Sequence, residues 1–401
     1  MYTWHISTAF GLEAVVGTEL KALGIEITGT GNGMLEVTGD AQTLARMQLW
    51  LRCAERISLV VDQFRARDFD DLFEGMLGCP WEEILPPDAH IVIVCPLASN
   101  ALIKSARSAQ AIAKKAVIER LKRATGQQYF PETGAAFSIT IDIAADTAKV
   151  LLDACGDGLH RRGYRVEPGA APVRETTAAA MVLLSEWVTL PGPDGVVRKE
   201  GRLAQGEILW DPCCGSGTIA IEAAMLAADI APGLMRYFAS ESWKFLDGGI
   251  FEAERSHAKE RALAGIEKPA PVVRASDTSP QAISAADGNM QRAGVAGRIK
   301  LFKADALEMA DPGAASLVLV NPPYGERLGD DEEADRVVAG MFDRMLTFRQ
   351  PWRCGLLTPN REINTVVGMR YRKNRKLYNS KICVWLCWFD GSDAGTEEPQ
   401  A

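Results

Sequence analysis

One short stretch of the sequence, NPPYGERLG at residues 321–329, has residue types that suit a chemical role. It follows the apolar run SLVLV (316–320), which predicts a buried strand. Proline has no N–H and pushes the residue before it into extended geometry, so the stretch can neither begin a helix nor extend a sheet. We therefore expect Asn321 and the carbonyl of Pro322 to be fixed at the strand tip, with their acceptors free for a ligand.

Two acceptors on one rigid edge suit methyl transfer to an exocyclic amine. Such a nitrogen shares its lone pair with the base ring. Holding its two hydrogens on the Asn321 side-chain oxygen and the Pro322 carbonyl pulls it towards tetrahedral geometry. The site would then work by orientation and placed dipoles, without a strong base. Pro323 would keep the edge rigid, and Tyr324 would stack on a base that is unpaired or flipped out. A lone Asn-Pro-Pro, by contrast, is usually a plain turn.

A second stretch, EILWDPCCGSGTIAIEAA (207–224), predicts a strand, a Gly-Ser-Gly turn and a helix. In doubly wound sheets the ligand lies beyond the carboxyl ends of the strands, and a glycine-rich first turn lets the backbone approach it. The glycines fit neither GxGxxG nor a P-loop, so a nucleotide-phosphate site is the weaker interpretation. The expected cofactor loop consists of Asp211, Pro212, Cys213, Gly215, Ser216, Gly217 and Thr218.

Two further acids follow predicted strands. Asp277 ends VVRASD, where a carboxylate can accept both hydroxyls of a ribose, and Asp305 ends LFKAD, where it can accept from an adenine amino group. An acid after a strand is more often a helix cap or a turn residue. Three acids at three consecutive strand ends, one of them beside the Gly-Ser-Gly turn, instead favour a cofactor that carries a nucleoside.

Together these segments resemble the THUMP-domain class I methyltransferases that use S-adenosylmethionine (SAM), and in particular the RlmL type of bacterial RNA guanine-N2 methyltransferase. The resemblance includes GLEAVVGTELKALG near the start, LHRRGYRV and APVRETTAAAMVLLSEW (171–187) at the junction, and AISAADGNMQRAGV after the second strand. In DPCCGSGT, Cys214 matches the family pattern and Cys213 occupies its variable position. The chain resembles only the amino-terminal methyltransferase half of the fused two-enzyme forms.

The resemblance implies an α/β chain in which a Rossmann-like class I methyltransferase domain is preceded by α+β ferredoxin-like and THUMP modules. The predicted elements agree with this order: the front part has an α+β pattern, and from about residue 170 strands alternate with helices as in a parallel α/β sheet. We expect a ferredoxin-like module at 1–67, a THUMP RNA-binding domain at 68–169, the methyltransferase domain at 170–390 and a polar tail at 391–401. The cofactor site is also expected to include Thr176, Thr278, Ala306 and Asn321. Glu326 and Arg327 fit the family pattern, either shaping the loop or contacting RNA.

Two basic segments could contact RNA although the net charge is −8. A helix is expected over about 105–125. Placing residues 103–123 on a helix at about 100° per residue puts five cations on one arc that carries no acid. A charged stripe is usually a solvated helix face, but this one favours phosphate contacts. The arc consists of Lys104, Arg107, Lys114, Lys115 and Lys122. RYRKNRK (370–376) is expected as a basic turn. Arg161, Arg162 and Arg165 are further candidates, and His160 beside them is expected to be structural.

Several classes of protein are disfavoured by what the sequence lacks. The nine cysteines include no CxxC pair and the four histidines are scattered, so we expect reduced thiols and no metal. The adjacent Cys213 and Cys214 are expected to pack as small residues. No apolar run reaches the roughly 18 residues of a membrane span, and MYTWHISTAFGLE lacks the features of a signal peptide. We expect a cytoplasmic protein that has no membrane partner.

The expected function is transfer of a methyl group from SAM to the N2 amine of a guanosine in structured RNA, with 23S rRNA preferred as substrate. A tRNA guanosine-N2 methyltransferase is one alternative. An adenine-N6 DNA methyltransferase is another, because Asn-Pro-Pro-Tyr serves that chemistry equally well. A non-catalytic RNA-binding protein with a relic pocket is a third, although the intact acids and the Asn-Pro-Pro-Tyr edge argue against it.

Overall fold

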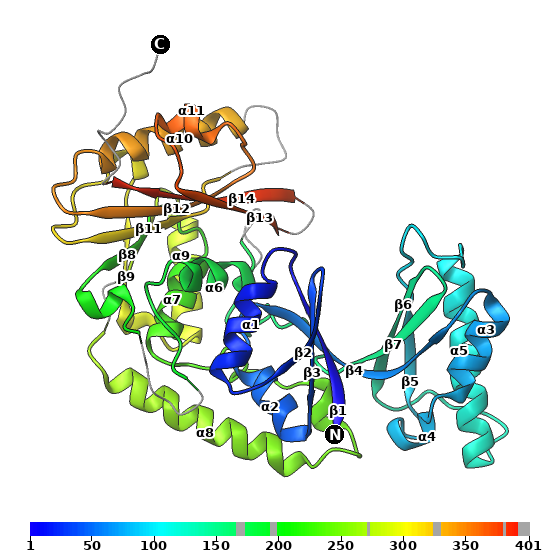
Figure 1. The fold of residues 1–401 in the computed structure, drawn as a ribbon. Coiled ribbons are helices and arrows are strands. Elements are labelled where there is room, and N and C mark those ends of the chain that lie inside the picture. Colours follow the sequence, from blue (N-terminus) through cyan, green and yellow to red (C-terminus); the bar gives the residue numbers. More distant parts are fainter. Residues whose placement is uncertain (166–172, 193–198, 271–272, 324–329, 380–381, 392–401) are drawn as a thin grey trace.

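Figure 1 shows a computed structural model of the 401-residue chain. It describes all residues except 166–172, 193–198, 271–272, 324–329, 380–381 and 392–401. The described part contains two seven-stranded sheets, one formed by the first half of the chain and one by the second. None of the helices in this part is long and apolar enough to cross a lipid bilayer.

The first sheet has the strand order β2-β3-β1-β4-β7-β6-β5. All its neighbouring strands pair antiparallel except β5 and β6, which are parallel. The strands are β1 (Tyr2–Thr8), β2 (Ile27–Gly31), β3 (Met34–Gly39), β4 (Ala54–Arg65), β5 (His90–Val94), β6 (Ala136–Ala144) and β7 (Thr147–Asp153). The helices of this half are α1 (Glu13–Ala22), α2 (Ala41–Trp50), α3 (Phe69–Gly78), α4 (Trp81–Ile84) and α5 (Ala106–Thr125).

Strand β4 joins the two front modules into one sheet (Figure 1). Its residues 54–59 pair with β1, and its residues 58–65 pair with β7. The strand ends at Arg65, two residues before the boundary expected at 67, but it contributes to both modules. The division of the front half into residues 1–67 and 68–169 therefore stays a prediction.

The second sheet has the strand order β10-β9-β8-β11-β12-β14-β13. Its first five strands run parallel, whereas β14 is antiparallel to both β12 and β13. The strands are β8 (Ile208–Asp211), β9 (Val273–Asp277), β10 (Ile299–Lys303), β11 (Ser316–Val320), β12 (Trp352–Thr358), β13 (Lys373–Asn379) and β14 (Ile382–Asp390). The helices are α6 (Glu175–Leu184), α7 (Thr218–Ala227), α8 (Gly248–Glu267), α9 (Pro280–Arg292), α10 (Asp330–Met345) and α11 (Ile363–Val367). Four 3₁₀ turns complete the described elements: η1 (Arg202–Gln205), η2 (Ala239–Ser242), η3 (Ala296–Arg298) and η4 (Ala306–Glu308).

Helices cover both faces of the second sheet: α6, α7 and α9 on one side and α10 and α11 on the other (Figure 1). Strand β11 is accordingly buried at every position, which explains its uninterrupted SLVLV sequence. The strand order reverses at β8, because β9 and β10 lie on one side of it and β11 and β12 on the other. Doubly wound sheets bind ligands at such a reversal, beyond the carboxyl ends of the strands.

The two halves are joined by a buried polar interface. Helix α8 packs against α2 of the front half (Figure 1). Ser240 donates to the side-chain oxygen of Gln48 at 3.0 Å, and Gln48 donates to the carbonyl of Ala154 at 2.7 Å. Buried Arg52 donates to the carbonyl of Ile230 at 2.6 Å. Because buried polar groups are costly to leave unpaired, these contacts hold the front half in one position on the second sheet.

Two expectations about local structure were wrong. The basic segment 370–376 is not a turn over its whole length, because β13 begins at Lys373 and pairs with β14. Helix α5 begins at Ala106, after Ser105 caps it by accepting from the N–H of Ser108. Lys104 therefore precedes the helix instead of lying on its surface. One face of α5 is buried at Ala109, Ala113, Ala116 and Val117, whereas Ile112 is only half-buried.

Candidate active site

Three carboxyl side chains lie at the carboxyl ends of neighbouring parallel strands. Asp211 is the last residue of β8, Asp277 is the last residue of β9, and Asp305 follows β10 by two residues. Burial raises the pKa of Cys213, and the charges of the three acids raise it further, so all three lie near this one loop. The expected gathering of these acids is confirmed by the geometry, whereas their role in cofactor binding stays a prediction.

Asp211 is the most deeply buried of the three acids, with 1% of its surface exposed. Its carboxyl accepts one long hydrogen bond, from the N–H of Cys213 at 3.4 Å. Burial, together with the nearby charge of Asp277, raises the pKa of Asp211 to about 8. A carboxyl that is destabilised in its charged form is well suited to receive a cation, because the cation would offset the cost of burying the charge.

The glycine turn is held in place by side chains from other elements. Asp277 accepts from the N–H of Gly215 and from that of Ser279, each at 2.9 Å. Asn289 on α9 donates to the carbonyl of Ser216 at 2.9 Å. Gly217 has a φ of +82°, and a Cβ added to it would lie 3.1 Å from the Cβ of Ala286. Gly217 is therefore required both for backbone conformation and for the close approach of α9.

Arg165 supports the same turn. Its guanidinium donates to the hydroxyl of Thr218 and to the carbonyl of Val173, and it lies 3.5 Å from the carboxylate of Glu175. The side chain is only 15% exposed. The expectation of an RNA contact is therefore wrong for Arg165, because its charge is engaged inside the protein beside the cofactor loop.

Asn321 lies at the tip of β11 as expected, in the residue after Val320. Its side-chain oxygen is buried and has no hydrogen-bond donor among the described residues. Pro322 after it is buried, and Pro323 is exposed. A buried acceptor without a partner costs free energy, and such a cost is typical of a group that is kept for a ligand. Tyr324, Glu326 and Arg327 lie outside the described residues, so their expected roles stay predictions.

The remaining expected positions also lie around this edge. Thr176 on α6 is 1% exposed, and its hydroxyl has no partner among the described residues. Thr278 is exposed directly after β9, and Ala306 is buried at the start of η4. Asp305 accepts from the N–H of Leu307 at 2.9 Å, which fixes its carboxylate. A Cβ added to Gly215 would meet no atom within 4 Å, so there is open space above the turn.

These observations fit a cofactor with a cationic centre and a nucleoside. The hydroxyl of Thr176, which has no partner among the described residues, can donate to a polar group of such a cofactor, and a positive charge on the cofactor would compensate the buried carboxyl of Asp211. Carboxylates held by backbone N–H groups, as in Asp277 and Asp305, keep lone pairs for hydroxyls and amines. Cys213 and Cys214 are free thiols, and burial raises the pKa of both, so neither is a reactive thiolate in this loop.

Of the five cations expected to contact RNA along α5, one already forms an ion pair within the protein. Lys114 pairs at 2.7 Å with Glu132, an acid that lies beyond the end of the helix, so the charge of this lysine is already compensated. The other four have no ion-pair partner among the described residues, and Lys115 also lies 5.7 Å from the centre of the Phe73 ring. We call these four residues the open cation set: Lys104, Arg107, Lys115 and Lys122.

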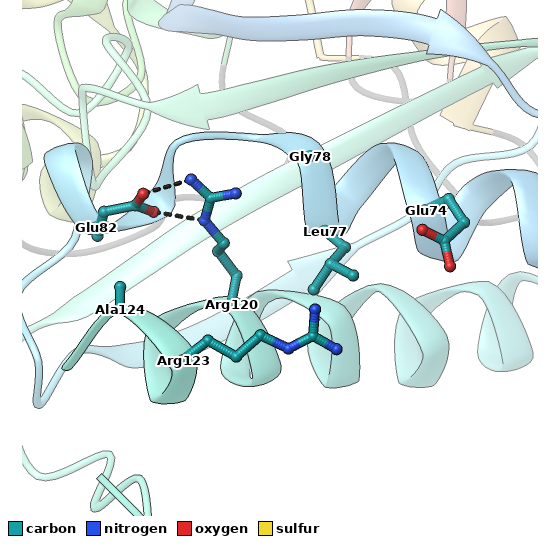
Figure 2. A pocket seen from close by; sticks show the side chains of 7 residues that line it. All are labelled: Glu74, Leu77, Gly78, Glu82, Arg120, Arg123 and Ala124. Atoms are coloured by element: carbon teal, nitrogen blue, oxygen red, sulfur yellow. Dashed lines mark hydrogen bonds and ion pairs between the residues drawn. The ribbon is translucent and has the colours of Figure 1, made fainter. Parts of the chain in front are cut away.

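Figure 2 shows the cations near the C-terminal end of α5, which differ from the open cation set. Here α5 and α3 border a pocket of about 470 Å³. Arg120 donates to the carboxylate of Glu82, with its Nε at 2.9 Å, and Arg123 pairs with Glu119. Glu74 lies on the opposite wall of the same pocket. Acids therefore neutralise Arg120 and Arg123, whereas Lys122 in the same last turns of α5 has no ion-pair partner among the described residues.

The adjacent arginines at the junction lie in different environments. Arg161 is 68% exposed and pairs with Asp157 at 3.1 Å. Arg162 is 2% exposed, donates to the carbonyls of Leu159 and Arg52, and lies 3.4 Å from the buried carboxylate of Glu222. The expected RNA contact is therefore wrong for Arg162. His160 is half-buried, and burial together with the neighbouring arginines lowers its pKa to about 4, which fits a structural role.

Comparison with known proteins agrees with this geometry. Residues 196–385 match the RMKL-like methyltransferase domain, and residues 3–58 match the RlmL ferredoxin-like domain. The chain is 34% identical over 386 residues to YpsC of Bacillus subtilis (strain 168), which is named as a candidate RNA methyltransferase. That match covers 95% of this chain and 94% of YpsC.

Two other similar proteins extend the comparison. The chain is 35% identical over 390 residues to the ribosomal RNA large subunit methyltransferase K/L of Methylococcus capsulatus, with 95% of this chain and 50% of that protein covered. It therefore spans about half the length of this K/L relative. The solved structure of SMU.472, a candidate methyltransferase in complex with SAH, has a TM-score of 0.86 at 32% identity and covers 97% of each chain.

The second sheet, its glycine turn and the acids at its strand ends define a Rossmann-like, class I methyltransferase domain, and the front half begins with a ferredoxin-like domain. The chain belongs to the RlmL-like family of methyltransferases, whose methyl donor is SAM.

Proposed function

We propose that this chain transfers a methyl group from SAM to the exocyclic N2 amine of a guanosine in structured RNA, with 23S rRNA preferred as the substrate. The observation that carries the proposal is the side-chain oxygen of Asn321, a buried acceptor without a donor among the described residues, at the tip of β11. The names of the K/L relative and of YpsC support RNA as the substrate class.

The bound cofactor supplies an electrophilic methyl group on a sulfonium. The side-chain oxygen of Asn321 and the carbonyl of Pro322 accept the two hydrogens of the target amine. This arrangement directs the nitrogen lone pair away from the base ring and towards the methyl group. The prolines at 322 and 323 restrict the backbone, so the two acceptors need little reorganisation during the reaction. The methylated nitrogen is cationic and loses a proton readily, so the site needs no strong base.

The cofactor is proposed to lie across the ends of β8, β9 and β10. Asp211 would offset a positive charge of the cofactor, since its burial leaves its own charge poorly compensated. Asp277 would accept from ribose hydroxyls and Asp305 from the adenine amino group. The open space above Gly215 allows the cofactor to approach the backbone of the turn. Thr176, whose hydroxyl lacks a partner among the described residues, would donate to the cofactor from α6.

The front half is proposed to bind the RNA. The open cation set extends from Lys104, just before α5, to Lys122 in the last turn of this helix. Phosphate contacts from Lys and Arg side chains supply affinity without reading sequence. The hydrogen bonds between the two halves would then fix the distance between the RNA-binding surface and the catalytic edge.

The proposal is tested by incubating the protein with radiolabelled SAM and separate pools of rRNA, tRNA and genomic DNA, and then digesting each pool to nucleosides. Label in N2-methylguanosine from rRNA is the expected result. The same nucleoside from tRNA would keep the reaction and change the substrate. The Asn-Pro-Pro edge suits the N6 amine of adenine equally well. Label in DNA as N6-methyladenine would therefore show that this amine is the substrate, and it would overturn the proposal.

A further inference from the structure

A cavity of about 300 Å³ lies directly beside the catalytic edge. Pro322 lines it on one side, and Ala334 and Val338 of α10 line it on another. Pro359, the residue after β12, closes a third side. The apolar side chains suit the faces of a planar ring, and the volume is at the lower end of small-molecule sites, which span about 300 to 1,000 Å³.

Four polar residues line the same cavity: Asp335, Thr358, Asn360 and Arg361. The side-chain N–H of Asn360 donates to Oδ2 of Asp335 at 2.8 Å. Asn360 is itself fixed, because its backbone N–H donates to the Thr358 hydroxyl at 3.1 Å and its side-chain oxygen accepts from the N–H of Glu362 at 2.8 Å. One oxygen of the Asp335 carboxylate is thus anchored, and none of the described residues donates a hydrogen bond to the other.

Arg361 supplies positive charge at the rim. Its side chain is exposed, and its guanidinium lies 4.7 Å from the centre of the Trp385 ring. A guanidinium stacked on an aromatic face keeps its in-plane N–H donors free for a ligand. The cavity therefore presents an acceptor, Asp335, and donors, on Arg361, to a ring that lies against Pro322.

We propose that this cavity holds the target base and that Asp335 selects guanine by accepting its N1–H. Guanine presents the N2 amine, the N1–H donor and the O6 acceptor along one edge. Its amine would then lie at Asn321, its N1–H at Asp335 and its O6 towards Arg361. Adenine has an acceptor at N1, which the carboxylate repels, and an amine where guanine has O6. Asn360 is a positioning residue that holds Asp335. This inference rests on the proposed function.

The test uses synthetic RNA hairpins that span the nucleotide labelled by the wild-type protein in transcribed 23S rRNA. One hairpin carries guanosine at that position and the other carries 2-aminopurine, which keeps the amine but has an acceptor at N1. Asparagine in place of Asp335 can donate to that acceptor and can still accept from Asn360. We therefore expect Asp335→Asn to lower the preference for guanosine over 2-aminopurine, measured as a ratio of kcat/KM values, by about 10- to 100-fold.

The matched control is Glu333→Gln, which neutralises an exposed acid two residues away on α10 and should leave the ratio unchanged. Asn360→Ala, which frees Asp335 to move, should lower the ratio partly, and it provides a second variant if Asp335→Asn does not fold. An unchanged ratio in Asp335→Asn, or an equal loss on both hairpins, would overturn the inference and leave the proposed function intact. Absence of N2-methylguanosine from the wild-type reaction would instead overturn the proposed function.

Discussion

Replacing Asp211 by asparagine should stabilise the cofactor-free protein at neutral pH. Burial raises the pKa of this carboxyl from 3.8 to about 8, and the N–H of Cys213, at 3.4 Å, is its one hydrogen-bond donor among the described residues. The folded state therefore binds a proton more tightly than the unfolded state does. The stability that this tighter proton binding at Asp211 contributes is fully present below about pH 4 and is lost as the pH rises towards about 8.

The size of the effect follows from the width of that window. Each pH unit within it changes the free energy of unfolding by about 1.4 kcal/mol, so this one group removes about 3 kcal/mol of stability between pH 5 and pH 7. Asparagine has no charge to bury, and the variant should not suffer this loss. Thermal unfolding without cofactor, followed at several pH values, measures the difference between the two proteins. Glu333→Gln, at an exposed acid, is the control and should follow the wild type.

If Asp211→Asn loses stability with pH as steeply as the wild type, the burial argument is incorrect. The carboxyl would then be compensated in the folded protein, and its suitability for a cationic cofactor would have no basis. A variant that is less stable than the wild type at pH 7 would contradict the sign of the effect as well as its size.

Three further predictions concern the cofactor loop, the buried ion pair between Arg162 and Glu222, and the proposed RNA-binding surface. Gly217→Ala should weaken SAM binding, measured by calorimetry, more than Gly206→Ala does. Both glycines have φ near +80°, but only Gly217 lacks room for a Cβ, and the left-handed conformation alone costs about 1–2 kcal/mol. Arg162→Met should lower the free energy of unfolding by about 3–5 kcal/mol because Glu222 stays buried without its cation, whereas Arg161→Met should change it little. Replacing the open cation set by glutamine should reduce the salt dependence of RNA binding, by a slope of about 0.7–0.9 for each phosphate that is no longer neutralised, and replacing Arg120 and Arg123 should reduce it less.

The sequence was most informative where a function depends on residues that are close together in the chain. The Gly-Ser-Gly turn after Asp211 and the Asn-Pro-Pro edge at 321–323 were both predicted at the strand ends where they occur. The acids at 277 and 305 were found in the same way, because each lies at the end of a short apolar strand. In these cases the local backbone rules for glycine, proline and strand ends decide the position.

Predictions failed where a residue's environment is set by distant parts of the chain. Arg161 and Arg162 are identical in type and adjacent, but only Arg162 meets Glu222, which lies sixty residues later. Strand β4 was not predicted, because three of its last four residues are polar and this end is held in the sheet by β7, a pairing across more than eighty residues. Asp335 belongs to the acidic run GDDEEAD, which is typical of solvated surface. Its hydrogen bond to Asn360 is the feature that distinguishes it.

The central claim is that Asn321 holds the amine that is methylated. It is tested most directly by comparing the wild type with Asn321→Ala on rRNA, using labelled SAM and nucleoside analysis, with SAM binding measured in parallel. The account predicts N2-methylguanosine from the wild type and a rate at least about 100-fold lower from the variant, with SAM still bound. Full activity in Asn321→Ala would contradict the account.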